Sequence, residues 1–279
     1  MTTPAPRPRR QLTRRGFLSL STGAVAAVAL AACTPTPAWV TPTGAAVDRA
    51  ERDRRGTGRV TTAALTAAAT TIDLAGTAAA TFSYGSVPGP VLRVRAGDTL
   101  QATLRNDLPF DTSVHWHGLA LRNDMDGVPP LTQQPIAAGD SFRYEFTAPD
   151  PGTHWFHPHV GAQLDTGLYG ALIVEDPNEP LRYDDEWVII LDDWLDGVTA
   201  TPDEVLEQLR QGMGEMGGHG DMFMRMGNML MGATSDLLGG DAGDVYYPHY
   251  LINGKPAHPN RGCRSWGLKP PVSSRLRAM

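Results

Sequence analysis

Short runs of alternating apolar and polar residues dominate the chain from about Val60 to Asp176. Leu92–Arg95 and Phe142–Phe146 alternate residue by residue, and clusters of turn-forming residues separate successive runs. Because neighbouring side chains in a strand point to opposite faces, this alternation predicts strands with one buried and one exposed face. Many short strands divided by turns are typical of an antiparallel β-sandwich. Residues 33–59 show no such period, since they are rich in Pro, Thr and Ala and then densely charged, and they predict a flexible tether.

The pattern changes beyond this region. Trp187–Leu191 is a nearly continuous apolar run, which indicates either a strand buried on both faces or a crossing segment. Thr201 precedes Pro202 and two acidic residues, and this order predicts the start of a helix that continues through Val205–Arg210. Residues 211–240 are rich in Gly and Met and predict a loop.

These patterns suggest an order of domains. We expect a sandwich domain over residues 60–195, a linker with a short helix and a Met-rich loop over 196–243, and the start of an incomplete second domain over 244–279. Tyr246–Asn253 resembles an opening strand of that second domain. From Asn260 the chain has five basic residues, no acid and two adjacent prolines, so we expect an aberrant tail and a truncated chain.

Composition and charge narrow the class of protein. The 279 residues include 30 Gly and 23 Pro, which favours turn-rich β structure over a helical bundle. Residues 1–32 hold five arginines and no acid, so 19 basic residues face 30 acidic ones from Cys33 onward. This negative charge disfavours a nucleic-acid partner. Cys33 and Cys263 are the only cysteines, which excludes a disulfide framework.

The N-terminal sequence predicts export. Thr13–Leu18 is a twin-arginine pattern, and the apolar run Gly23–Ala32 is too short to span a bilayer as a stable helix. Leu30–Cys33 resembles a bacterial lipobox, in which the cysteine becomes the lipidated first residue of the mature protein. We therefore expect residues 1–32 to be a signal peptide, and the mature protein to be an extracytoplasmic lipoprotein anchored to the membrane through Cys33.

Two histidine motifs carry the candidate chemistry. His115 and His117 are separated by one residue, as are His157 and His159, so each pair places two imidazoles on one side of an extended strand. Two such strands lying side by side would bring four imidazoles into one small volume. Neutral imidazole binds copper, zinc, nickel or iron, so the pattern predicts a transition-metal site without naming the metal.

The surroundings of the two motifs resemble a known family. Both motifs lie in aromatic segments, with Asn123–Pro129 between them and Gly167–Gly170 after them. This combination resembles the first cupredoxin domain of multicopper oxidases, the laccase-like family, over roughly residues 70–195 and more weakly over 244–256. The resemblance implies an all-β fold, a cupredoxin-like Greek-key β-sandwich, with copper as the cofactor. It also implies oxidation of phenolic or metal-ion substrates coupled to reduction of O2 to water, with O2 and a small reducing substrate as partners.

The resemblance also implies a role for each motif residue. It would place a type 2 copper on His115. The type 3 copper pair would be held by His117, His157 and His159. Asp126 would lie behind the copper-bound water and help to deliver protons as O2 is reduced. For a lone Asp-Gly, the alternative is that Asp126 simply forms a turn.

Two further features stay outside this ligand set. His154 has the opposite parity to His157 and His159, so it should face away from the cluster unless a bulge intervenes. Met213–Met231 holds seven of the ten methionines together with His219. Thioethers suit Cu(I), but these methionines follow no regular period, which favours a flexible linker over a copper site.

The resemblance ends before the chain does. The sequence has no His-Cys-His motif for a blue-copper centre, and Cys263 has no neighbouring histidine. Three hypotheses stay open. The chain is a truncated multicopper oxidase, inactive alone, whose reading frame is lost near Ala257; or it is a stand-alone copper-binding cupredoxin module, or a subunit completed by another chain; or it is a structural sandwich with zinc or no metal. An oligomer that shares ligands between subunits is possible geometrically.

Overall fold

A computed structural model describes residues 41, 43–54, 56–211, 224–226, 229–231, 234–235, 240–241, 245–257 and 274–278. The chain divides into two compact units, residues 1–41 and 42–279, and nearly all described residues belong to the second. The predicted signal peptide, Cys33, Cys263 and most of the Met-rich segment lie outside the described residues. Within the described ranges, no helix combines the length and apolar character needed to cross a bilayer.

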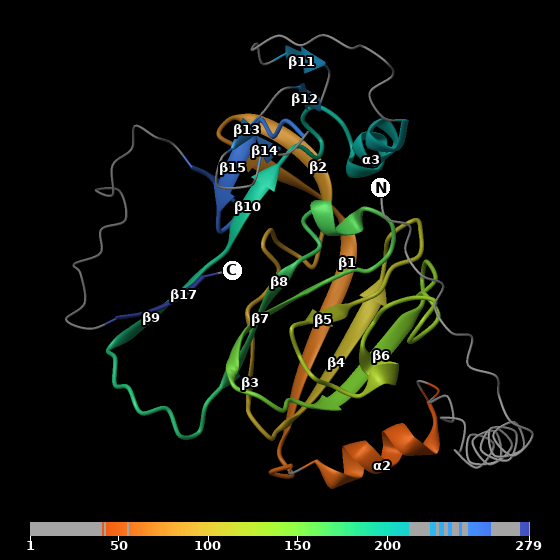
Figure 1. The fold of residues 1–279 in the computed structure, drawn as a ribbon, viewed down its shortest axis with the longest axis vertical. Coiled ribbons are helices and arrows are strands. Elements are labelled where there is room, and N and C mark those ends of the chain that lie inside the picture. The colour runs from red at the N-terminus through yellow and green to blue at the C-terminus, as the bar shows by residue number, and fades with distance from the viewer. Residues whose placement is uncertain are drawn as a thin grey trace, which may run out of the picture. The chain divides into compact units, whose positions relative to one another are not determined.

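Two four-stranded sheets form the centre of the second unit (Figure 1). The first sheet has the order β2-β1-β4-β6, with β1 Val60–Leu74, β2 Thr77–Ser83, β4 Thr99–Asn106 and β6 Ser141–Thr147. The second has the order β3-β8-β7-β5, with β3 Leu92–Arg95, β5 His115–His117, β7 Gly152–His157 and β8 Gly170–Glu175. The all-β sandwich expected from the alternating pattern is confirmed.

The sheets are mixed rather than purely antiparallel. β1 pairs in parallel with β4, and β3 pairs in parallel with β8, whereas the other pairs in the two sheets are antiparallel. Parallel neighbours need a crossover connection. For β1 and β4 the chain makes this connection through the other sheet: after β2 of the first sheet it forms β3 in the second sheet, and it then returns to the first sheet as β4. Alternation of apolar and polar residues does not predict this crossover, because parallel and antiparallel strands can both have one buried face.

The core lies between the two sheets. Leu100 and Leu104 point inward from β4, and Trp116 and Phe156 point inward from β5 and β7, all with 0% exposure. The Trp116 ring packs edge-on against Tyr144, with ring centroids 5.6 Å apart. Each such aromatic side chain removes a large apolar area from water, so these contacts hold the short strand β5 against the sandwich.

A second core cluster covers the outer face of β8. Strand β10, Leu191–Trp194, pairs with β15, His249–Ile252, and Leu251 of β15 packs in one cluster with Ile173 of β8. β8 is therefore buried on both faces. Of the two interpretations of Trp187–Leu191, the strand buried on both faces is wrong, because Trp187 is 40% exposed and Leu191 is 60% exposed. That run instead crosses from β9, Asp185–Ile189, to β10.

Short elements complete the described part of the chain. The helix expected after Thr201 is confirmed as α3, Pro202–Gln211, and the Glu204 carboxylate accepts the Thr201 backbone N–H at 2.7 Å in a capping box. The remaining elements are η1 Asn123–Met125, η2 Gln163–Asp165, β11 Met224–Met226, β12 Met229–Met231, β13 Thr234–Ser235, β14 Gly240–Asp241, β16 Lys255–Pro256 and β17 Ser274–Ala278. β11 with β12 and β13 with β14 form antiparallel pairs inside the segment expected to be a loop.

Part of the expected tether is a helix. Residues 45–53 form α2, Ala45–Asp53, which Figure 1 shows beside the end of the β4–β6 pair. Val47 is 8% exposed, and the Glu51 carboxylate accepts the backbone N–H of Thr147 at 3.0 Å. The tether expectation failed here because one buried apolar residue and one charged contact fix the helix, and neither produces an apolar period.

The inward face of β6 offers a test of the core. We expect Phe146→Ala, at a side chain that is 1% exposed, to lower the free energy of unfolding by about 3–5 kcal/mol, because it removes buried apolar area and leaves a cavity. Equilibrium unfolding in urea measures this change. The control Leu131→Ala, at a side chain that is 74% exposed, should stay within about 0.5 kcal/mol of the parent. Equal effects of the two substitutions would contradict the assigned core.

Candidate metal centre

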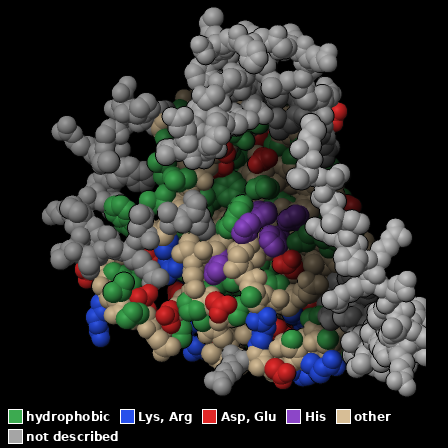
Figure 2. All heavy atoms as spheres, viewed as in Figure 1, with side chains coloured by type: hydrophobic (Ala, Val, Ile, Leu, Met, Phe, Trp, Pro, Cys, Tyr) green, Lys and Arg blue, Asp and Glu red, His purple; other side chains and the backbone are tan. Residues whose placement is uncertain are grey.

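The two histidine motifs lie on neighbouring antiparallel strands. In the register of β5 and β7, His115 is opposite His157 and Trp116 is opposite Phe156. Trp116 and Phe156 fill the core, so the histidines point to the other face of the sheet. Figure 2 shows histidine side chains gathered on this face beside hydrophobic and acidic side chains. Strand parity therefore puts His115 and His157 on the outside of the sandwich and Trp116 and Phe156 on the inside.

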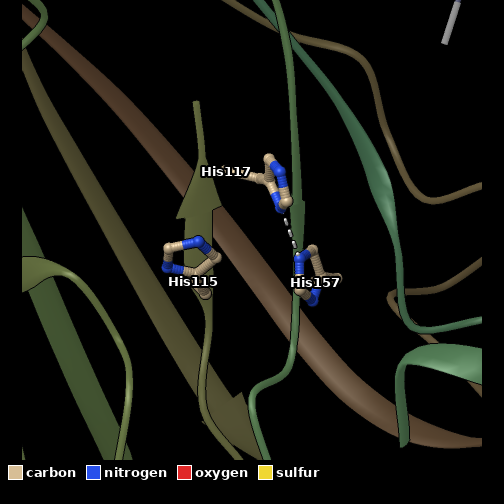
Figure 3. A group of neighbouring side chains, drawn as sticks. All are labelled: His115, His117 and His157. Atoms are coloured by element: carbon tan, nitrogen blue, oxygen red, sulfur yellow. Dashed lines mark hydrogen bonds between the residues drawn. The ribbon is translucent and has the colours of Figure 1, made fainter. Parts of the chain in front are cut away.

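Three imidazoles come within the reach of one metal ion. One nitrogen from each of His115, His117 and His157 lies within 4.8 Å of the others, and Figure 3 shows the three rings turned toward one another. Nδ1 of His117 is 3.1 Å from Nε2 of His157. The ring centroids of His115 and His157 are 5.4 Å apart. Convergence of the two motifs, which sequence parity predicted, is confirmed for these three residues, while their role as ligands stays a prediction.

Backbone carbonyl groups set the orientation of two of the rings. The carbonyl oxygen of Asp126 accepts a hydrogen bond from Nδ1 of His115 at 2.8 Å, and the carbonyl oxygen of Pro158 accepts one from Nδ1 of His157 at 2.8 Å. A neutral imidazole that donates through Nδ1 has a free lone pair on Nε2. These two rings therefore present Nε2 as the ligand atom. His117 differs, because it turns Nδ1 toward His157.

Trp155 forms one wall of the histidine cluster. Its ring centroid lies 4.2 Å from that of His157 and 4.9 Å from that of His117, with the ring planes inclined by about 30° in both cases. Trp155 has the same parity as His157 on β7, so it stacks on the outer face with the histidines. Stacking restricts ring rotation and removes water from one side of the pair.

His159 lies beside the three-residue cluster rather than within it. Its ring centroid is 5.4 Å from that of His115 and 6.1 Å from that of His157. It follows the end of β7, where its backbone N–H donates to the hydroxyl of Ser113 at 3.0 Å. Sequence spacing alone did not show that the second histidine of this motif sits past the end of the strand. Its position leaves it next to His115, at the margin of the group.

Asp126 reaches the cluster through its backbone and its side chain together. Its carbonyl oxygen is 2.8 Å from Nδ1 of His115, and its carboxylate is 3.4 Å from the same nitrogen. The carboxylate is 28% exposed, so it touches both solvent and the histidine. The carbonyl contact could not be read from the sequence, because a backbone group leaves no trace in residue identity. The predicted proton-delivery role of the carboxylate is compatible with this placement and stays a prediction.

Gly127 holds the loop of Asp126 against β5. Its φ angle is +75°, and a Cβ atom at this position would lie 1.7 Å from the carbonyl oxygen of Val114. The backbone of the loop thus packs directly on the residue that precedes His115, which only glycine permits.

His154 lies outside the three-residue cluster, as its parity predicts. Its ring contacts the backbone of Gly118 and Gly152, where added Cβ atoms would lie 3.3 Å and 2.7 Å from its nitrogens. Within the described residues its Nε2 is buried without a hydrogen-bond partner. This ring packs between two glycines instead of joining the cluster.

Comparisons with known proteins decide what kind of protein carries this arrangement. A family profile described as multicopper oxidase matches residues 66–179. Multicopper oxidase MmcO of Mycobacterium tuberculosis is 46% identical over 250 residues, which cover 88% of this chain and 48% of that protein. Copper resistance protein A of Escherichia coli is 43% identical over 46% of this chain and 21% of its own length.

The chain is similar to multicopper oxidases over most of its length. Laccase from Botrytis aclada superposes with a TM-score of 0.58 and 27% identity, over 84% of this chain and 40% of the laccase. A multi-copper oxidase from Pseudomonas thermotolerans superposes with a TM-score of 0.53 and 28% identity, over 71% of this chain and 42% of that protein. The fold is thus the cupredoxin-like sandwich of this family. The chain spans about half the length of the M. tuberculosis relative, and a fifth of the E. coli one.

Copper is the cofactor of multicopper oxidases, and the donor set fits it. The cluster offers imidazole nitrogens, which suit copper in both oxidation states, on rings that hydrogen bonds and Trp155 hold in place. Asp126 is the nearby acid, and its carboxylate lies 3.4 Å from Nδ1 of His115. A set of this kind can hold a metal while leaving room for a small molecule on the open side.

The histidines of this cluster differ in pKa. Burial lowers the pKa of His157 to about 4, and the neighbouring imidazoles reinforce this effect. Burial also opposes protonation of His115, but hydrogen bonds to the side chain and backbone of Asp126 outweigh it and raise the pKa of His115. Burial and the nearby imidazoles lower the pKa of His117. The lowered pKa keeps the His157 ring neutral at neutral pH.

A cavity of about 950 Å³ opens beside His117 and Trp155 and extends to β10. Its lining includes Tyr169 and Asp192, and the tyrosine hydroxyl donates to the aspartate carboxylate at 2.5 Å. Burial raises the pKa of Asp192 to about 6. Sequence reasoning missed this pair. The available signal was the acid Asp192 directly after the apolar run that ends at Leu191.

Gly127 offers a test of how the Asp126 loop is held. We expect Gly127→Ala to lower the free energy of unfolding by about 3–5 kcal/mol, because the new Cβ meets the Val114 carbonyl and the left-handed backbone is strained as well. The control Gly139→Ala has φ +85° with nothing within 4 Å, so strain alone should cost about 1–2 kcal/mol. Urea unfolding compares the two variants, and an equal loss would show that the loop does not pack on β5 as described.

The pKa differences predict two separate histidine titrations in the metal-free protein. His115 should gain its proton above pH 6.5 and His157 only near pH 4. As pH falls from 6.5 to about 4, the unfolded chain protonates His157 before the folded one does, so this residue lowers stability over that range. His115 acts in the opposite direction: its stabilising contribution is complete below pH 6.5 and is lost as pH rises through its folded pKa. Side-chain 15N NMR would measure both, and a shared midpoint would contradict the assignment.

Proposed function

We propose that this chain supplies the first-domain half of the copper centre of a multicopper oxidase. The whole enzyme would oxidise phenolic or metal-ion substrates and pass the electrons to O2, which takes up protons and becomes water. The observation that carries this proposal is the convergence of nitrogens from His115, His117 and His157 within 4.8 Å on the outer face of the sheet. The similarity to the M. tuberculosis oxidase over 88% of this chain supports the same assignment.

Each residue of the site has a proposed task. His115 would hold one copper through Nε2, while its Nδ1 stays bonded to the Asp126 carbonyl. His117 would bind through Nδ1 and His157 through Nε2, because these two nitrogens already face each other at 3.1 Å. His159 would complete the set from the margin of the group. Bound copper supplies one-electron redox chemistry, and the protein fixes its geometry.

Proton supply is the proposed task of Asp126. Reduction of O2 to water consumes protons as well as electrons, so a carboxylate between solvent and the site would shorten their route. The Asp126 carboxylate is 28% exposed and 3.4 Å from Nδ1 of His115. This position places the carboxylate between solvent and the His115 ring.

Further parts of the proposal concern the rest of the protein. The sequence has no motif for a blue-copper site, so we infer that these ligands and the remaining histidines come from another segment or another chain. The N-terminal pattern supports an extracytoplasmic protein, with Cys33 as a lipid anchor. An extracytoplasmic oxidase would meet O2 and small reducing substrates outside the cell.

Copper binding tests the site directly. We expect the full chain to bind Cu(I) in an anaerobic competition with a chromophoric chelator, and His117→Ala combined with His157→Ala to weaken the affinity by about 100-fold or more, since two facing nitrogens are removed. The control His154→Ala, an imidazole on the same strand outside the cluster, should change the affinity less than about twofold. Equal losses in both variants, or no copper bound by the parent chain, would overturn the proposal.

The same copper-loaded samples separate the possible functions. For this chain alone we expect no absorption band near about 600 nm and no O2 uptake with a phenol, because the blue-copper ligands are not in its sequence. A His-Cys-His motif encoded in another frame after the codon for Met279, with O2 uptake once that segment is supplied, supports the oxidase. Copper binding without O2 uptake in either case indicates a stand-alone copper module. Zinc binding with no copper indicates a structural site.

A further inference from the structure

Arg122 links two elements, α2 and η1, close to the histidine cluster. Its Nε and Nη2 atoms donate to the two carboxylate oxygens of Asp124 at 2.6 Å and 2.7 Å, a two-pronged pair. Its Nη2 also lies 3.4 Å from the carboxylate of Asp48, on α2. Arg122 itself is the residue before η1. One guanidinium group therefore connects the N-terminal helix with the 3-10 turn that leads to Asp126.

The Asp124 carboxylate makes this link energetically important. Asp124 is only 8% exposed, and a buried carboxylate is stable only when a charged partner and hydrogen bonds compensate for its lost hydration. The planar fork of arginine meets both oxygens at once and so fixes the orientation of the carboxylate as well as its charge. Lysine could restore the charge but not this two-point geometry.

From Asp124 the constraint passes to the metal site through the backbone. The N–H of Asp126 donates to the carbonyl oxygen of Asn123 at 3.3 Å, which closes the turn. Met125 accepts the N–H of Glu145 on its sulfur at 3.4 Å, which fastens the same turn to β6. The carbonyl of Asp126 then receives Nδ1 of His115 at 2.8 Å. A shift of η1 would move this carbonyl and release the His115 ring.

α2 contributes a second support for the turn. Besides Asp48, it places Glu51 against the backbone N–H of Thr147 at the end of β6. Glu51 is itself paired with Arg54 at 2.8 Å. Val47 is buried. The helix is thus attached both to β6 and to Arg122.

We propose that Arg122 is a positioning residue for the metal centre, and that α2 supports it so that the N-terminal segment helps to set the tautomer of His115. The guanidinium holds η1, η1 holds the Asp126 carbonyl, and the carbonyl keeps the proton of His115 on Nδ1. Nε2 is then presented for the metal. The segment before the sandwich is in this view part of the site's scaffold. The value of this arrangement for copper rests on the proposed function, but the arrangement itself does not.

The experiment measures the tautomer of His115 in the metal-free full chain. Side-chain 15N shifts, recorded at a pH above the measured titration of His115, report which nitrogen of the neutral ring carries the proton. We expect mostly Nδ1–H in the parent chain and a mixture of tautomers in Arg122→Lys. Asp48→Asn should give a smaller change in the same direction, and the control Asp53→Asn, an exposed carboxylate on the same helix, should match the parent.

Hydrogen exchange and copper affinity complete the test. In Arg122→Lys we expect amide exchange over residues 123–127 to accelerate by about tenfold and Cu(I) affinity to fall by about 10-fold, the effect of losing support behind a ligand. Faster exchange with an unchanged His115 tautomer would overturn the positioning role, and Asp48→Asn indistinguishable from Asp53→Asn would overturn the role of α2. If the parent chain bound no copper while the tautomer still responded, the proposed function would fail and this inference would stand.

Discussion

The antiparallel pairing of β5 with β7 is the constraint on which the rest of the site depends. In this register Trp116 and Phe156 are opposite each other and enter the core, so His115 and His157 must face outward together. The core therefore fixes the candidate site: burial of Trp116 and Phe156 sets the face on which His115 and His157 lie. A shift of one residue would exchange the two faces, burying imidazole and exposing indole, and the loss of apolar burial opposes it.

In addition to this pairing, the polar contacts of the site give its histidines different pKa values. His157 lies deep, bonded to a backbone carbonyl, and its pKa is lowered to about 4, whereas hydrogen bonds to Asp126 raise the pKa of His115. One ring is thereby kept neutral and ready to bind a cation. The other can accept a proton next to the Asp126 carboxylate, which lies 3.4 Å from its Nδ1. Two histidines of the same cluster thus have different pKa values, because burial acts on His157 and hydrogen bonds to Asp126 act on His115.

Sequence parity was sufficient to predict which faces of β5 and β7 carry histidine, because a period of two is a local property. The same reasoning correctly set His154 apart from the cluster. It could not locate His159 at the margin, since the strand ends at His157 and parity no longer applies beyond it. Nor could it find α2, which is fixed by Val47 and by the contact of Glu51 with a backbone N–H. Contacts made by backbone groups, and burial of one strand by another that is distant in sequence, leave no pattern in the local sequence.

Burial of β8 on both faces has a consequence for where the sandwich can be separated from the downstream chain. Ile173 of β8, Trp194 of β10 and Leu251 of β15 share one apolar cluster, so the outer wall of the sandwich is built from residues almost eighty positions downstream. A recombinant fragment that ended at residue 195 would lack β15, so Ile173 would lose the contact with Leu251 and become exposed to water. A fragment that keeps this wall must therefore extend at least through β15 and β16, to about Ala257, even though the sandwich strands themselves end at Glu175.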